Sequence, residues 1–168
     1  MELLELVNNL QTVLEIDDLK DMPNKLLAIA LSDDDTAKDA IVEAVGGDLS
    51  VDFLQAVYQY YSADRKDLKQ DFTPKSLARL VSAMIGETDT CIDLCAGSGA
   101  LSIQRHNTQP EYDFVCYEYD ENVIPYLLFN LVIRNMSGVI YQGDVLTNSE
   151  KPKYRIERGE KYGHVINF

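Results

Sequence analysis

Histidine, cysteine and long apolar runs are scarce in this sequence, and each shortage excludes a class of protein. The 168 residues include two histidines, His106 and His164, and three cysteines, Cys91, Cys95 and Cys116. They are not grouped at the spacings of zinc ligands, so no metal site is predicted. The odd number of cysteines, in strand-like apolar stretches, favours small buried thiols. No apolar run could span a bilayer and the acidic N-terminus lacks a signal peptide's basic start, so we expect a soluble, cytoplasmic protein with no membrane partner.

Basic residues are also few. The chain has 15 Lys and Arg against 28 Asp and Glu, which gives a formal net charge of −13. Because phosphate backbones bind through Lys and Arg, we expect this chain alone to bind nucleic acids poorly. A role on DNA would need a basic surface from another subunit or from a further recognition domain.

The pattern of apolar residues changes near residue 70. In residues 1–69, apolar residues recur at three- and four-residue intervals, which predicts an all-helical lobe of four helices. In residues 70–168, a first helix with Leu77, Leu80 and Met84 on one face is followed by short apolar runs that alternate with helices. The runs predict strands over 90–94, 112–117, 139–141 and 164–168. This alternation predicts right-handed crossovers and a parallel, doubly wound sheet, with the polar residues 147–163 as a loop.

The sharpest motif is CIDLCAGSGAL, residues 91–101. A predicted strand there ends in Asp93, and a loop of small residues turns into a helix: Ala96, Gly97, Ser98 and Gly99. Glycines allow a close backbone approach to a ligand, and helix N-terminal amides point into the crevice at the strand ends. A dinucleotide fingerprint would have a third glycine where this chain has Ser102. An acid just before the loop suits a ligand with a positive amine, which favours the methionine end of S-adenosylmethionine over NAD; a purely structural turn is the alternative.

Two more acidic residues follow predicted strands. Glu118, with Tyr119 after it, comes at the end of the second strand, where a carboxylate can accept hydrogen bonds from both ribose hydroxyls. The alternative is that Glu118 only begins the next helix, where negative charge is favourable. Asp144, between Gly143 and Val145, follows the third strand and could accept a hydrogen bond from an exocyclic amino group. Gly-Asp is also a common turn, so this third motif is weak alone.

Together with Phe72, Thr73 and Pro74, these motifs resemble those of N6-adenine DNA methyltransferases, most closely the modification subunits of type I restriction systems. In that family a helical lobe leads into a Phe-Thr-Pro segment, then an Asp…Gly-x-Gly loop, a ribose-binding acid and Gly-Asp. This chain has all four in that order. The resemblance implies an α/β fold: a partial, Rossmann-like S-adenosylmethionine-dependent methyltransferase sheet (residues 70–168) preceded by the helical lobe (residues 1–69).

The resemblance also implies a role for each matched residue. Phe72, Thr73 and Pro74 would border the methionine part of S-adenosylmethionine. Asp93 and the loop Ala96–Gly99 would hold its amino acid group. Glu118, with Tyr119, would bind the ribose, and Asp144 with Val145 the adenine.

This chain departs most from that family in the catalytic motif. The family has Asn or Asp, then Pro, Pro and an aromatic residue, after its fourth strand, where the motif holds the target amino group. Here the predicted strand ends in Asn167 and Phe168 without Pro-Pro, so the chain stops inside the motif or the motif is altered. By resemblance, Asn167 is the catalytic candidate.

We therefore expect the cofactor-binding portion of a DNA adenine methyltransferase, inactive alone, which reaches DNA through a recognition domain or a partner subunit. The alternative is a non-catalytic, methyltransferase-like interaction or dimerisation module. An open sheet edge near residues 164–168 would invite pairing with another chain, as a homo- or hetero-oligomer.

Overall fold

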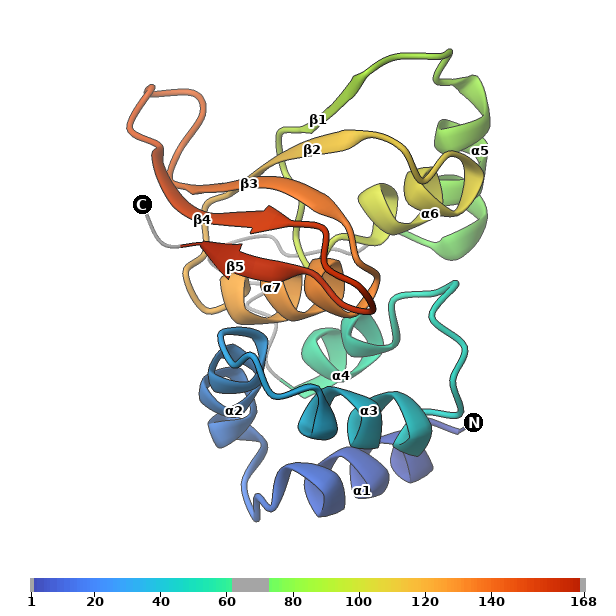
Figure 1. Cartoon of the computed structure of the whole chain (residues 1–168), viewed down its shortest axis with the longest axis vertical. Coiled ribbons are helices and arrows are strands. Elements are labelled where there is room, and N and C mark those ends of the chain that lie inside the picture. Colours follow the sequence, from blue (N-terminus) through green and yellow to red (C-terminus); the bar gives the residue numbers. More distant parts are fainter. Residues whose placement is uncertain (1, 62–72, 167–168) are drawn as a thin grey trace.

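The computed structural model describes residues 2–61 and 73–166. These residues form seven α-helices, one short 3-10 helix and five strands (Figure 1). The helical part contains α1 (Leu3–Leu14), η1 (Leu19–Asp21), α2 (Met22–Ala30), α3 (Asp35–Ala44) and α4 (Phe53–Tyr61). The rest contains α5 (Lys75–Met84), β1 (Thr90–Asp93), α6 (Ala100–Thr108), β2 (Asp113–Glu118), α7 (Ile124–Ile133), β3 (Ser137–Gln142), β4 (Lys151–Glu157) and β5 (His164–Ile166).

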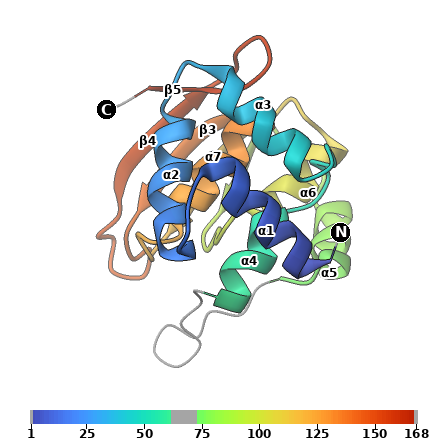
Figure 2. The ribbon, with the colours of Figure 1, turned by 90° about the horizontal axis from the view of Figure 1, so that it is seen from below.

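Helix α7 lies at the centre of the molecule, between the sheet and the layer formed by α1–α4 (Figures 1 and 2). All ten of its residues are buried, as expected for a helix that is apolar on every side. It contacts β3 and β4 on one side and α2 on the other. Buried apolar residues from α1, α2 and α4 join those of α7 and the sheet in one hydrophobic core. The four predicted helices therefore form, and they share their core with the sheet.

The sheet has the strand order β1-β2-β3-β4-β5. The prediction of parallel strands is confirmed for β1, β2 and β3. It is wrong for the pairing of β5, the predicted fourth strand, which pairs antiparallel with β4, and β4 pairs antiparallel with β3. The predicted loop over 147–163 is also wrong, because it contains β4. Short connections on both sides of β4 make hairpins, and hairpins join antiparallel neighbours. On β4, Tyr154 is half-buried and Ile156 is buried, whereas Arg155 between them is exposed.

The position of β5 also differs from the expected doubly wound sheet. Strand order follows chain order throughout the described residues, so the reversal that defines a doubly wound sheet is not present among them. Strand β5 lies at the edge opposite β1. The structure therefore establishes a mixed α/β fold in which only the first three strands have the expected arrangement.

Two apolar surfaces are exposed. Helix α5 buries its small residues, Ala78 and Ser82, against α6, and its predicted apolar face points outward: Leu80 is 57% and Met84 77% exposed. The sheet face opposite the buried Phe114 carries Ile92, which is 62% exposed.

None of the described helices combines the length and apolar character needed to cross a membrane.

Candidate cofactor-binding site

The loop after β1 and the end of β2 meet at one edge of the sheet. The strands are parallel and Asp93 is paired with Cys116, so Glu118 lies two residues further along β2, about 7 Å beyond that pair. The amide of Ala96 donates to the carbonyl of Tyr117 at 2.9 Å. This bond fixes the start of the loop against β2, as expected for a ligand crevice at the carboxyl ends of parallel strands.

Asp93 is held inside its own loop. Its Oδ1 accepts from the Cys95 amide at 3.3 Å, and its Oδ2 accepts from the Ser102 hydroxyl at 3.2 Å. Burial raises the pKa of the Asp93 carboxyl, and the bonds from Cys95 and Ser102 oppose that rise. The carboxylate is therefore partly desolvated, and a nearby positive charge would stabilise its ionised form.

Two glycines give the loop its shape. Gly97 and Gly99 have φ values of 55° and 100°, a left-handed conformation that other residues adopt at a cost. A side chain on Gly99 would also come within 3.1 Å of Leu127 on α7. Helix α6 begins directly after Gly99, so the loop brings the helix N-terminus to the sheet edge.

Glu118 faces this loop. Its Oε2 accepts from the Gly97 amide at 2.8 Å, and its Oε1 accepts from the Asp120 amide at 2.8 Å. A carboxylate can accept about four hydrogen bonds, so both oxygens keep capacity for a ligand. Burial raises the pKa of Glu118; backbone amides oppose that rise, and the charge of Asp120 adds to it. Glu118 can therefore hold the loop through the Gly97 amide and still accept hydrogen bonds from a ribose, as predicted.

A cavity of about 330 Å³ opens beside Glu118, near the lower end of the usual size of small-molecule sites. It is lined by Leu94, Cys95, Glu118, Tyr119, Gly143, Asp144, Val145 and Leu146. The amide of Gly143 donates to the carbonyl of Glu118 at 3.0 Å, which ties the third motif to the second. Asp144 Oδ1 accepts from the Leu146 amide at 2.9 Å, so this carboxylate also shapes its own turn. The residues predicted to bind ribose and adenine therefore share one hollow.

Other predicted site residues lie beside this cavity or away from it. Asp93 and the loop Ala96–Gly99 are not among its lining residues. Thr73 and Pro74 precede α5, and the Thr73 carbonyl accepts from Gln55 Nε2 at 3.1 Å. Phe72 and Asn167 lie outside the described residues. Strand β5, which precedes Asn167, is four strand positions from β1, or about 19 Å.

Sequence reasoning missed two residues of this region. Cys95 is exposed and lines the cavity, although it was predicted to be a buried thiol. Asn130 is fully buried in α7 and hydrogen-bonds to the Ser98 carbonyl at 2.8 Å. The signal for Asn130 was available, because a lone amide within the apolar sequence IPYLLFNLVI must find buried partners.

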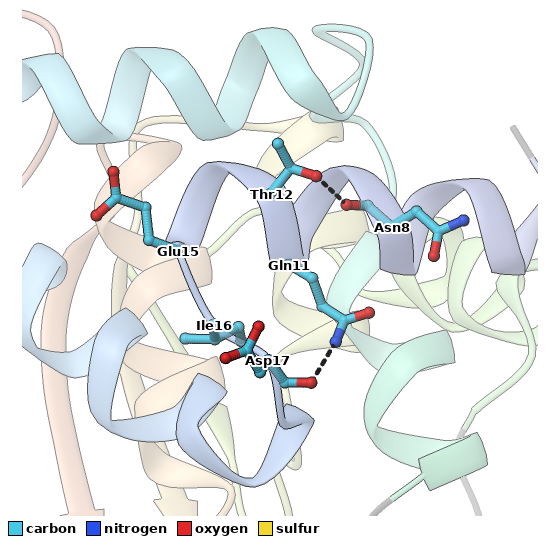
Figure 3. A pocket seen from close by; sticks show the side chains of 6 residues that line it. All are labelled: Asn8, Gln11, Thr12, Glu15, Ile16 and Asp17. Atoms are coloured by element: carbon cyan, nitrogen blue, oxygen red, sulfur yellow. Dashed lines mark hydrogen bonds between the residues drawn. The ribbon is translucent and has the colours of Figure 1, made fainter.

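A second hollow, of about 470 Å³, lies at the end of α1 (Figure 3). It is lined by Asn8, Gln11, Thr12, Glu15, Ile16 and Asp17. Its polar side chains are partly engaged locally: Gln11 Nε2 donates to the Asp17 carbonyl at 2.9 Å and Thr12 Oγ1 to the Asn8 carbonyl at 2.8 Å. None of the predicted site residues belongs to this hollow.

Comparison with protein-family models, with curated proteins and with solved structures gives no match for this chain. What the crevice binds is therefore inferred from its residues and their geometry.

Proposed function

We propose that this chain binds S-adenosylmethionine at the ends of β1 and β2, as the cofactor-binding part of an N6-adenine DNA methyltransferase. The observation that carries the proposal is the position of Glu118. Its carboxylate lies 2.8 Å from the Gly97 amide and borders the cavity that also contains Asp144 and Val145. Glu118 would bind the ribose hydroxyls, and the adenine would lie toward Asp144.

The charge of the crevice also supports this ligand. S-adenosylmethionine carries a sulfonium and an ammonium group, and Asp93 and Glu118 are carboxylates whose pKa values are raised by burial. A positive ligand would stabilise their ionised forms, whereas the pyrophosphate of a dinucleotide would be repelled by them. The methionine carboxylate would lie at the N-terminus of α6, where backbone amides favour negative charge.

For this chain we propose cofactor binding without catalysis. Methyl transfer requires the amine to approach the methyl group in line, at about 3–3.5 Å. Strand β5 is about 19 Å from β1, and the net charge of −13 disfavours DNA binding. The target-holding group and the basic surface would have to come from another subunit or another domain.

Calorimetry with S-adenosylmethionine and S-adenosylhomocysteine tests the proposal. We expect saturable binding by the native chain and loss of about 10- to 150-fold in affinity in Glu118→Ala, because hydrogen bonds to a charged acceptor are worth about 1.5–3 kcal/mol. The matched control is Glu121→Ala, which removes the same charge from an exposed position three residues later. No binding by the native chain, or equal affinity in both variants, would contradict the proposal.

The exposed face of α5 favours a second candidate function, an interaction module. Leu77, Leu80 and Met84 are 48%, 57% and 77% exposed on one helix, and apolar patches on a surface often mark protein contacts. Light scattering distinguishes the candidates. A monomer that binds S-adenosylmethionine supports the first, and a dimer that Leu80→Glu dissociates supports the second.

A further inference from the structure

A buried polar cluster outside the cavity joins the helical part of the chain to the loop after β1. At its centre is Asn130 of α7, which is 0% exposed. Its Nδ2 donates to Asp52 Oδ1 at 2.8 Å and to the Ser98 carbonyl at 2.8 Å. Asp52 directly precedes α4, and Ser98 lies in the Gly97–Gly99 turn. One amide group therefore holds two segments that are distant in the sequence.

Arg134 fixes the orientation of that amide. Its Nη1 donates to Asn130 Oδ1 at 2.9 Å, so the oxygen end of the amide is occupied and the NH₂ end faces Asp52 and Ser98. Arg134 also donates to the carbonyls of Leu49 and Val51, at 2.8 Å and 2.7 Å. Burial raises the pKa of Asp52, and Ser98, Arg134 and Asn130 all oppose that rise.

Helix α4 contacts two further parts of the crevice. Gln55 donates to the carbonyl of Thr73 at 3.1 Å. The hydroxyl of Tyr58 donates to Asp120 Oδ2 at 3.0 Å, and the Asp120 amide in turn donates to Glu118 at 2.8 Å. The start of α4 and its first two turns thus reach the segment before α5, the loop after β1 and the turn after β2.

We propose that Asn130 is a positioning residue of the cofactor crevice. By fixing the Ser98 carbonyl to Asp52, it holds the Gly97–Gly99 turn in the shape that receives the ligand, and it makes the helical part of the chain a component of the site. The inference depends on the proposed function for the identity of the ligand.

The substitution Asn130→Ser separates positioning from simple support. The shorter side chain removes the N–H donor to the Ser98 carbonyl and to Asp52 without adding charge. Asp52 Oδ1 still accepts from the Gln55 amide at 2.9 Å, so the start of α4 keeps its cap.

The matched control is Asn107→Ser. Asn107 Nδ2 donates to the Ser50 carbonyl at 2.7 Å, so it links α6 to the helical part without contacting the loop. We expect Asn130→Ser to melt at a lower temperature than the native chain, because Asp52 and Arg134 lose a buried partner. At a temperature where both variants are folded, Asn130→Ser should bind S-adenosylmethionine about five- to tenfold more weakly, as for one lost hydrogen bond. The control should stay within about twofold of native affinity.

Native affinity in Asn130→Ser would overturn the positioning role. If Asn130→Ser does not fold, Asn130→Leu removes the same donor at nearly the same side-chain volume, and the same comparison of affinities with Asn107→Ser decides. If the native chain binds no S-adenosylmethionine, the proposed function fails, and the shape of the loop is measured instead by the reactivity of Cys95. An altered rate of Cys95 alkylation by iodoacetamide in Asn130→Ser, with a native rate in Asn107→Ser, supports positioning; equal rates in both refute it.

Discussion

The substitution Asp93→Asn separates the contribution of this residue to binding from its contribution to folding. An asparagine can keep both hydrogen bonds of Asp93. Its Oδ1 can accept from the Cys95 amide, and its Nδ2 can donate to the Ser102 hydroxyl. That hydroxyl can then turn toward the Cys116 sulfur, 3.6 Å away. The change therefore removes a buried negative charge and leaves the local geometry in place.

The expected effect on stability is an increase at neutral pH. Burial raises the pKa of Asp93 in the folded chain, so the folded state binds more protons than the unfolded state between the two pKa values. Stability is then lost as the pH rises through that window, and it stays reduced above the folded pKa. Asp93→Asn removes this penalty, so its melting temperature should exceed that of the native chain at pH 7 and approach it on acidification.

The expected effect on binding is the opposite. A charge-assisted hydrogen bond to the ligand ammonium contributes about 1.5–3 kcal/mol, so affinity for S-adenosylmethionine should fall about 10- to 150-fold. Calorimetry and thermal unfolding of the same samples measure both effects, and the control is Asp89→Asn, which changes an exposed carboxylate directly before β1. A variant that binds as well as the native chain would refute the assignment of Asp93.

Three other predictions follow from the same contacts. The pKa of the Cys95 thiol is raised by burial and by the charges of Glu118 and Asp93. Glu118→Gln should therefore lower this pKa and speed the alkylation of Cys95 at pH 8, as measured by mass spectrometry. The control Glu121→Gln should leave the alkylation rate unchanged. Arg134→Met should lower the free energy of unfolding in urea by about 3–5 kcal/mol, because it leaves the carbonyls of Leu49 and Val51 and the Asn130 side-chain oxygen without their donor. A loss below about 1 kcal/mol would refute this role. Gly143→Ala should lower the free energy of unfolding by about 1–3 kcal/mol and weaken S-adenosylmethionine binding. The reason is that Gly143 has φ 142° and that a Cβ would lie 2.6 Å from Glu150 Cα. An unchanged free energy of unfolding would show that the turn can move to accept the side chain.

The helices and the first three strands could be predicted because their signals are local. The apolar spacing of Leu6, Leu10 and Leu14 predicts α1, and the structure buries all three. The run from Phe114 to Cys116 similarly predicts β2. The strand-end positions of Asp93 and Glu118 follow from these elements, since neighbouring parallel strands have their carboxyl ends at the same edge of the sheet.

The second half of the sheet could not be predicted in the same way. In β4, the alternation of Tyr154 and Ile156 with charged residues is typical of a strand with one buried face, but the segment KPKYRIE also suits a polar loop. Pairing with β3 makes this segment a strand and not a loop. Similarly, Leu80 and Met84 predict a buried face on α5, whereas the close contact of Ser82 with Gln104 and Thr108 turns the opposite side inward.

The sequence by itself determined the helices and the first three strands of this protein, and which acidic residues stand at the ends of those strands. The tertiary structure alone decided that β5 lies at the edge opposite β1, that Glu118 closes the loop through Gly97, and that Asn130 joins Ser98 to Asp52. The physical reason is that the two kinds of interaction act over different distances along the chain. Periodicity and turn residues act over a few positions, whereas strand order and buried hydrogen bonds depend on partners that are brought close only by folding.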